Sequence, residues 1–165
     1  MQIPQKVADR INEQIKNEFW SSWTYRAMAY ACEDMGFKIF AKYFFRQADE
    51  EVEHATKLAD YLLDQGAKVK LTAIDAPKTD YKSLQEVCET FVSHEKKVTE
   101  QVHEINRLAR DENDLATENF IRWKVDEQVE EVSSATELHQ MVSMAETKGQ
   151  LFMLENRLWH MIEGK

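Results

Sequence analysis

Residues 45–66 read FRQADEEVEHATKLADYLLDQG, a helical segment whose apolar face carries an amide, an acid and a histidine. Residues three or four positions apart share one face of an α-helix. The residues that follow this spacing, beginning just upstream, are Phe40, Phe44, Gln47, Glu51, His54, Leu58 and Tyr61. Glu51 and His54 form an E-x-x-H pair near the middle, so both side chains reach one point inside the predicted core. Gly66 then ends the helix.

Three other segments show the same helical periodicity: about 5–34, a segment that begins near Ser83 and runs to a polar turn at 111–114, and a segment from that turn to about Val142. The breaks within each pair of helices are short, whereas residues 66–82 form a long polar connection. A short apolar helix follows Gly149, at about 150–163. Two hairpins joined by one long crossover predict an all-α four-helix bundle, at about 5–145, with a short fifth C-terminal helix. The whole chain, 1–165, is expected to be a single domain.

The composition agrees with long helices and excludes two classes of partner. The 165-residue chain has 4 Gly, 2 Pro and 31% charged residues, which are few turn formers for its length. A net charge of −9 argues against a nucleic-acid binder, since phosphate contacts need a basic face. No apolar run approaches the ~20 residues that span a bilayer, and the N-terminus lacks the features of a signal peptide. We therefore expect a cytoplasmic protein without nucleic-acid or membrane partners, whose Cys32 and Cys88 are reduced core thiols.

An acid or an amide interrupts each of the four core stripes near its middle. The interrupting residues on the other three helices are Glu18, Glu95, Gln128 and Glu131. In an antiparallel hairpin, residues equidistant from the turn lie side by side. The mean of 18 and 51 is 34.5 and the mean of 95 and 131 is 113, so each pair is centred on a predicted turn. The interruptions are expected to form one layer if the two hairpins pack with their ends level.

Four buried carboxylates in one layer require positive charge, because each unpaired ion costs several kcal/mol of desolvation. Lys124 is the one cation on the four stripes, and it is expected one turn away from Gln128. Carboxylate oxygen and imidazole together favour iron, manganese or zinc. The pattern therefore predicts two metal ions in the layer, with a carboxylate bridging them.

Three segments of the chain resemble bacterial non-haem ferritins, and the likeness extends over essentially the whole sequence. The segments are NEQIKNEFWSSWTYRAMAY at 12–30, FRQADEEVEHATKLADYLLDQG at 45–66 and FIRWKVDEQVEEV at 120–132. The resemblance implies a ferritin-like fold, iron storage and a homo-oligomeric shell of 24 subunits. It also implies ferroxidase activity, in which O2 or H2O2 oxidises Fe(II) to Fe(III) at a di-iron centre inside each subunit before storage as a ferric mineral.

The resemblance also implies metal-binding roles for individual residues. Those that match ligands of the first iron are Glu18, Glu51 and His54. Those that match ligands of the second iron are Glu51, Glu95 and Glu131, with Gln128 close by. Those that match a third, outlying iron site are Glu50, Glu127 and Glu130. Tyr25 and Trp123 match aromatic residues that flank the centre, and Tyr25 is included among the expected catalytic residues.

Two features separate the chain from bacterioferritins. Those proteins carry a second E-x-x-H on the fourth helix, where this chain has QVEE at 128–131. They also place a haem-ligating Met directly after the second-helix Glu, where this chain has Val52. We therefore expect iron and no haem.

The sequence is also compatible with two other functions. A di-iron peroxide reductase would consume H2O2 without building a mineral, and a helical scaffold would keep core acids for a structural purpose. Titrating the metal-free protein with Fe(II) anaerobically and then adding O2 separates the three. A scaffold binds no iron stoichiometrically, a peroxide reductase stops at a few irons, and a ferritin continues far beyond the capacity of its site.

Overall fold

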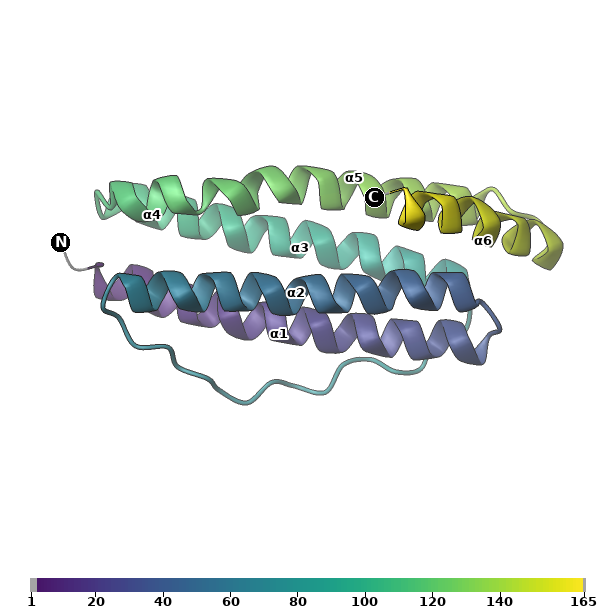
Figure 1. Ribbon diagram of the computed structural model, residues 1–165, viewed down its shortest axis with the longest axis horizontal. Coiled ribbons are helices and arrows are strands. Elements are labelled where there is room, and N and C mark those ends of the chain that lie inside the picture. The colour runs from purple at the N-terminus through teal and green to yellow at the C-terminus, as the bar shows by residue number, and fades with distance from the viewer. Residues whose placement is uncertain (1–2, 165) are drawn as a thin grey trace.

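The computed structural model describes residues 3–164, which fold into helices without a strand. The helices are α1 (Gln5–Asp34), α2 (Lys38–Asp64), α3 (Leu84–Asp111), α4 (Leu115–Phe120), α5 (Arg122–Ser143) and α6 (Lys148–Glu163). The long helices α1, α2, α3 and α5 form a bundle, and the segment between α2 and α3 runs along its outside from one end to the other (Figure 1). The predicted all-α four-helix bundle with one long crossover and a C-terminal helix is confirmed.

The turns within the two hairpins close with the same hydrogen-bond pattern. Gly36 has a φ of 87°, and the amide of the next residue donates to the carbonyl of Cys32 over 2.8 Å. Asn113 has a φ of 55°, and the amide of the next residue donates to the carbonyl of Ala109 over 2.8 Å. Glycine and asparagine adopt positive φ at lower cost than other residues, which is why they end helices in this way. Both turns are short and fix the register of each antiparallel hairpin.

The crossover is attached to the bundle at its start and ends in a helix cap. The side-chain amide of Asn12 donates to the carbonyl of Lys68 over 3.0 Å, and its oxygen accepts from the amide of Lys70 over 2.6 Å. The hydroxyl of Ser83 accepts from the amide of Glu86 over 3.2 Å, as the sequence predicts for the start of α3. These bonds fix where the second hairpin begins relative to the first.

The fourth and last helices differ in detail from the prediction. The fourth is divided at Ile121 into α4 and α5, yet Ile121 keeps helical angles and its carbonyl accepts from the amide four residues on over 3.1 Å. The two pieces therefore continue one another in the bundle (Figure 1). α6 begins at Lys148 and not after Gly149, because Thr147 and Gln150 each accept a hydrogen bond from the other's backbone amide.

α6 packs against the start of α2. Leu158 is buried, and a carboxylate oxygen of Glu155 accepts hydrogen bonds from the amides of Ile39 (2.6 Å) and Phe40 (3.3 Å). The first amides of a helix have no partner within it and carry partial positive charge. Glu155 therefore caps α2 from a different helix and holds α6 against the bundle.

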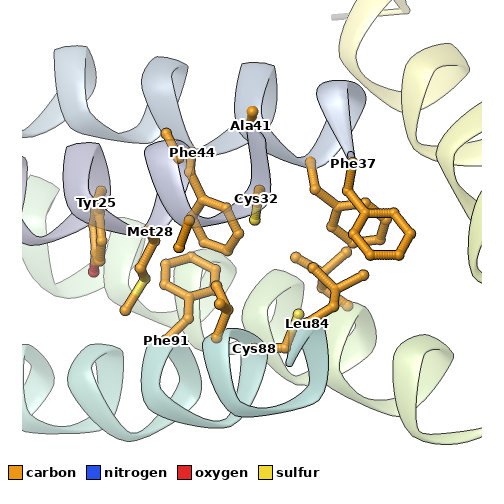
Figure 2. Close-up of a cluster of buried hydrophobic side chains, with 14 of the residues drawn as sticks. Tyr25, Met28, Cys32, Phe37, Ala41, Phe44, Leu84, Cys88 and Phe91 are labelled. Atoms are coloured by element: carbon orange, nitrogen blue, oxygen red, sulfur yellow. The ribbon is translucent and has the colours of Figure 1, made fainter. Parts of the chain in front are cut away.

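Two apolar clusters fill the bundle, one on each side of a polar layer. The aromatic cluster lies toward the α1–α2 turn (Figure 2), and its members include Tyr25, Phe37, Phe40, Phe44 and Phe91. The aliphatic cluster fills the other end, and its members include Ile11, Ile15, Leu58, Val98 and Ile105. Cys32 and Cys88 are free thiols buried in the aromatic cluster, as predicted (Figure 2). Among the described helices, none combines the length and the apolar character needed to cross a membrane.

Candidate metal centre

A layer of polar side chains separates the two apolar clusters. Its buried members are Glu18 from α1, Gln47, Glu51 and His54 from α2, Glu95 from α3, and Lys124 and Gln128 from α5. Contacts join the two hairpins across this layer: Nζ of Lys124 lies 3.4 Å from Oε2 of Glu18, and Gln47 donates to Oε2 of Glu131 over 3.2 Å. The hairpins thus pack with their ends level, which is the condition under which the spacing predicts a single layer.

Glu18, Glu51 and His54, called here the histidine half, point their ligand atoms at one another. Oε2 of Glu51 lies 3.2 Å and Oε2 of Glu18 lies 3.6 Å from Nδ1 of His54. Each residue offers one such atom within 4.8 Å of the other two. Gln14, one turn earlier on α1, donates to Oε1 of Glu18 over 2.7 Å and so orients the carboxylate. Oxygen and nitrogen donors from two helices therefore converge on one point.

Glu95, Gln128 and Glu131, called here the glutamate half, are held by neutral donors. The hydroxyl of Tyr25 donates to Oε1 of Glu95, and Nε2 of Gln128 donates to Oε2 of Glu95 over 3.1 Å. Gln47 supplies the donor for Glu131. No lysine, arginine or histidine within residues 3–164 forms an ion pair with either acid.

Lys124 lies inside the layer, which corrects the expectation that its charge stays one turn away. Its side chain is fully buried, and its Nζ lies 2.7 Å from Nδ1 of His54, 3.4 Å from Oε2 of Glu18 and 4.0 Å from Oε2 of Glu51. The spacing locates the backbone of Lys124 but not the end of a long, flexible side chain. Part of the positive charge that the buried carboxylates require therefore comes from the chain itself.

Charge in the histidine half is divided unequally between its two acids. Burial raises the pKa of Glu18, but the Lys124 ammonium and the bonds to Glu51 and His54 outweigh burial, so this pKa lies well below its usual range. Burial raises the pKa of Glu51 well above its usual range, although Lys124 opposes the rise and Glu18 adds to it. Burial lowers the pKa of Lys124, but Glu18 and Glu51 raise it further. The Lys124 ammonium thus favours the carboxylate form of Glu18, whereas burial favours the protonated form of Glu51.

The contact with Lys124 decides the protonation of His54. Burial lowers the pKa of His54, while bonds to Glu127, Glu18 and Glu51 raise it to about 11. A nitrogen–nitrogen distance of 2.7 Å leaves room for one proton between the two groups, so the ring cannot be doubly protonated beside a charged Lys124. We assign that proton to Lys124, which makes Nδ1 the acceptor. An unprotonated imidazole nitrogen is the form that binds a metal ion.

Burial raises the pKa values of both acids of the glutamate half. Burial raises the pKa of Glu95, although the bonds from Tyr25 and Gln128 oppose this. Burial, followed by the charges of Glu95 and Glu50, raises the pKa of Glu131 to about 7. Burial and Glu95 also raise the pKa of Tyr25, so the phenol stays a donor. Burial thus favours the protonated forms of these acids, and no ammonium lies beside them as Lys124 lies beside Glu18.

The donors of the layer suit a metal ion. Two oxygen atoms of the buried layer have no hydrogen-bond partner among the described residues: Oε2 of Glu18 and Oε1 of Gln128. Leaving a buried acceptor without a donor costs about 1–3 kcal/mol, and a bound cation removes that cost. Carboxylate and amide oxygens with one imidazole nitrogen are a donor set for iron, manganese or zinc.

The outlying acids line one cavity next to the layer. Glu50, Glu127, Glu130 and Glu131 face a space of about 230 Å³ that α6 covers with Leu158, Met161 and Ile162. Glu50 accepts a hydrogen bond from Nε of Arg46 over 3.3 Å, and Glu130 is exposed. Glu127 also reaches the histidine half, since its Oε2 lies 3.1 Å from Nε2 of His54. The structure therefore brings the three acids of the expected third site to one cavity. Their partners differ, because Glu50 bonds Arg46, Glu127 faces His54 and Glu130 is exposed.

Sequence reasoning missed one residue that orients a ligand, Gln14. Gln14 was not singled out, although its place four residues before Glu18 on α1 is a detectable signal for a side-chain contact. The two aromatic residues that were singled out do flank the layer. Tyr25 bonds Glu95, and the Trp123 ring centroid lies 5.6 Å from that of His54.

Comparison with known proteins agrees with this fold. A family model described as a ferritin-like domain matches residues 8–145. The bacterial non-heme ferritin of Staphylococcus saprophyticus is 35% identical over 157 residues, which cover 94% of both chains. That of Staphylococcus aureus (strain USA300) is 32% identical over 157 residues, covering 94% of this chain and 95% of its own. A crystal structure of an open pore ferritin from Archaeoglobus fulgidus superposes with a TM-score of 0.93 at 35% identity, covering 95% of this chain and 98% of that one. The chain therefore belongs to the ferritin family.

Proposed function

We propose that each subunit oxidises Fe(II) at a two-iron site and stores the product as a ferric mineral. The ligands of the first iron are Glu18, Glu51 and His54. The ligands of the second iron are Glu51, Glu95 and Glu131, with Gln128 beside it. Glu51 is common to both sets, so it bridges the two ions.

The observation that carries this proposal is the convergence of Glu18, Glu51 and His54, whose ligand atoms lie within 4.8 Å of one another inside a ferritin bundle. Four-helix bundles of this family form metal sites from a Glu-x-x-His pair and glutamates on facing helices. Glu51 and His54 are such a pair, and Glu95 and Glu131 stand on the facing hairpin. The glutamate half supplies the second set of oxygens at the same level.

Iron is the substrate of this reaction, and the protein's residues bind and orient it. Carboxylate oxygens are hard ligands that stabilise Fe(III) relative to Fe(II), so each bound Fe(II) gives up one electron more readily to O2 or H2O2. Gln14 and Gln128 hold Glu18 and Glu95 in fixed orientations by hydrogen bonds of 2.7 and 3.1 Å. Tyr25 orients Glu95 from the side of the aromatic cluster. The apolar clusters lie on both sides of the layer along the bundle.

The outlying acids support a third, weaker iron site. Glu50, Glu127 and Glu130 line one cavity beside Glu131, and they offer oxygen without imidazole. A site that is more exposed and lacks a nitrogen donor is expected to hold iron less tightly and to act as an exit or reservoir.

Family membership supports a hollow homo-oligomeric shell of 24 subunits around the mineral. Several large apolar side chains are exposed on the single chain and offer area for such contacts: Tyr30, Leu115, Val129 and Met153. We further propose that the shell is cytoplasmic and carries no haem, since Val52 offers no axial ligand. Light scattering tests the mass of the assembly, and the Soret absorbance tests the haem content.

The iron capacity of the protein separates storage from its alternatives. The metal-free protein is titrated with Fe(II) under argon, O2 is admitted, and the cycle is repeated. We expect uptake to continue far beyond the capacity of the site and to yield ferric mineral. Uptake that stops at a few irons and consumes H2O2 would indicate a peroxide reductase, and absence of stoichiometric binding would indicate a scaffold.

The shared ligand gives the sharpest test of the site. Glu51→Ala removes an oxygen from both irons, so we expect rapid oxidation of Fe(II) to be lost while the helical circular dichroism is unchanged. The matched control is Glu53→Ala, an exposed acid on the same helix, which should oxidise iron as the wild type does. A Glu51→Ala protein with the wild-type initial rate would contradict the proposed centre.

A further inference from the structure

Lys124 contacts every ligand of the histidine half. Its Nζ lies 2.7 Å from Nδ1 of His54, 3.4 Å from Oε2 of Glu18 and 4.0 Å from Oε2 of Glu51. These are the atoms that converge within 4.8 Å of one another as metal donors. The ammonium group therefore occupies the region in which an ion bound by these three atoms would lie.

An ammonium and a divalent ion cannot share this place. Bonds from carboxylate oxygen or imidazole nitrogen to such metals are about 2.0–2.2 Å long, so an ion bound by all three atoms would lie against Nζ. Two positive groups at that separation repel strongly in a buried environment. The nitrogen lone pair of His54 that would bind the metal is also the acceptor of the Lys124 hydrogen bond.

We propose that Lys124 acts as a resident cation of the histidine half, which the first metal ion must displace in order to bind Glu18, Glu51 and His54. This inference rests on the proposed two-metal site and assigns a regulatory residue to it. Lys124 neutralises the buried acids of the metal-free bundle and so sets a threshold for metal at this half. The glutamate half has no such competitor among the described residues, so it fills first.

The displaced ammonium has an acceptor within reach. Oε2 of Glu127 lies 3.7 Å from Nζ of Lys124, one turn along α5, and it also faces Nε2 of His54 at 3.1 Å. Metal binding therefore transfers Lys124 from the histidine half toward Glu127. This couples the metal centre to the cavity of the outlying acids, because Glu127 lines that cavity.

Removing the competitor should tighten metal binding, and calorimetric titration with Co(II) under argon measures this without any oxidation. The variants are Lys124→Met, which keeps the length of the side chain, and Lys124→Gln, which keeps a hydrogen-bond donor. The matched control is Lys57→Met, which removes an exposed ammonium that stacks on the Trp123 ring at 3.7 Å and contacts none of the acids. Co(II) binding to the histidine half should become tighter by about tenfold or more in both Lys124 variants. Lys57→Met should bind Co(II) as the wild type does.

Thermal unfolding of the metal-free proteins supplies the second readout. If Lys124 stabilises the metal-free state and leaves when metal binds, its removal should lower the melting temperature without metal, and saturating Co(II) should close the gap to the wild type. Should Lys124→Met not fold without metal, Lys124→Gln provides both measurements. Agreement between the two variants also excludes direct ligation by the new thioether or amide.

The remaining outcomes separate this inference from the proposed function. Unchanged or weaker Co(II) binding in both Lys124 variants, with a normal wild-type isotherm, would overturn the competition while leaving the metal centre in place. Absence of Co(II) binding in the wild type and in all variants would overturn the two-metal site, and the competition with it.

Discussion

The two halves of the polar layer solve the same electrostatic problem in different ways. The histidine half places two buried acids beside an internal ammonium, that of Lys124, at 3.4 and 4.0 Å. The glutamate half also contains two acids, Glu95 and Glu131, but surrounds them with a phenol and two amides. One half contains a built-in cation, and the other surrounds its acids with neutral donors.

This difference shows that a buried acid pair alone does not determine how a metal binds. In the glutamate half, metal exchanges with protons, so its affinity depends on pH. In the histidine half, metal exchanges with an ammonium that the chain cannot release. The two ions of one centre are thus expected to bind by different exchanges, although Glu51 is a ligand of both.

Among substitutions that distinguish the two halves, removal of the His54 imidazole should have the largest effect on iron oxidation. His54→Ala deletes a ligand of the histidine half alone, so the rapid oxidation of Fe(II) should fall by about a hundredfold or more, since even outer-shell partners of metals are worth ten- to a hundredfold. Stopped-flow absorbance measures the initial rate. Co(II) should still bind the glutamate half. His139→Ala, on the same bundle but bonded to Gln85 and Ser143, is the control. An initial rate equal to that of the wild type would show that His54 is not a ligand.

The protons of the glutamate half should be visible in pH-dependent stability. The pKa of Glu131 is raised to about 7 from an ordinary value of 4.5, so its contribution to stability is fully present below pH 4.5 and is lost as pH rises through about 7. Glutamine does not ionise, so Glu131→Gln removes the loss of stability at high pH. Without metal, the variant should therefore melt roughly 2–4 °C above the wild type at pH 8 and at the same temperature near pH 4.5.

Glu130→Gln, an exposed neighbour on the same helix, is the control for this pH series and should follow the wild type. The same protons predict that Co(II) affinity of the glutamate half falls as pH decreases from 8 to 6. A Glu131→Gln melting curve parallel to that of the wild type at every pH would argue against a proton on Glu131.

Substitutions of the outlying acids should have the smallest effects on iron oxidation. They test which of these acids acts on the histidine half. Glu127 lies 3.1 Å from Nε2 of His54, whereas Glu130 is exposed and contacts neither half. Glu127→Ala should slow the first oxidation of iron by about tenfold, the lower end of what an outer-shell partner of a metal contributes. Glu130→Ala should leave that first phase unchanged and alter later turnover. Equal effects of the two substitutions on the first phase would show that the contact of Glu127 with His54 does not influence the oxidation.

The bundle and its layer could be predicted from the sequence because both follow from spacing. Every residue of the stripe from Phe40 to Tyr61 is buried, as the three- and four-residue spacing predicts. The layer could be predicted because its residues are equidistant from two turns. This pairing holds only for short turns, and the positive φ angles of Gly36 and Asn113 make both turns short. Spacing gives the backbone position of each residue, and for short side chains that is sufficient.

The remaining features depend on side-chain reach and local backbone geometry, which spacing does not give. Lys124 was located on the correct stripe, but its four-carbon chain carries the charge into the layer. Glu127 was expected to point off the stripe, yet it turns toward His54. Glu131 stays only half-buried because it opens on the cavity under α6. The division of the fourth helix at Ile121 has no glycine or proline to signal it.

An anomalous-scattering map recorded at the iron edge, from crystals soaked in Fe(II) under argon, tests the two-iron centre most directly. We expect two strong peaks in each subunit, one among Glu18, Glu51 and His54 and one among Glu51, Glu95 and Glu131, with the glutamate-half peak stronger at limiting iron. Density at the outlying acids should be weaker than either. A map without peaks in the polar layer, or with iron confined to the exposed acids, would contradict the centre proposed for this protein.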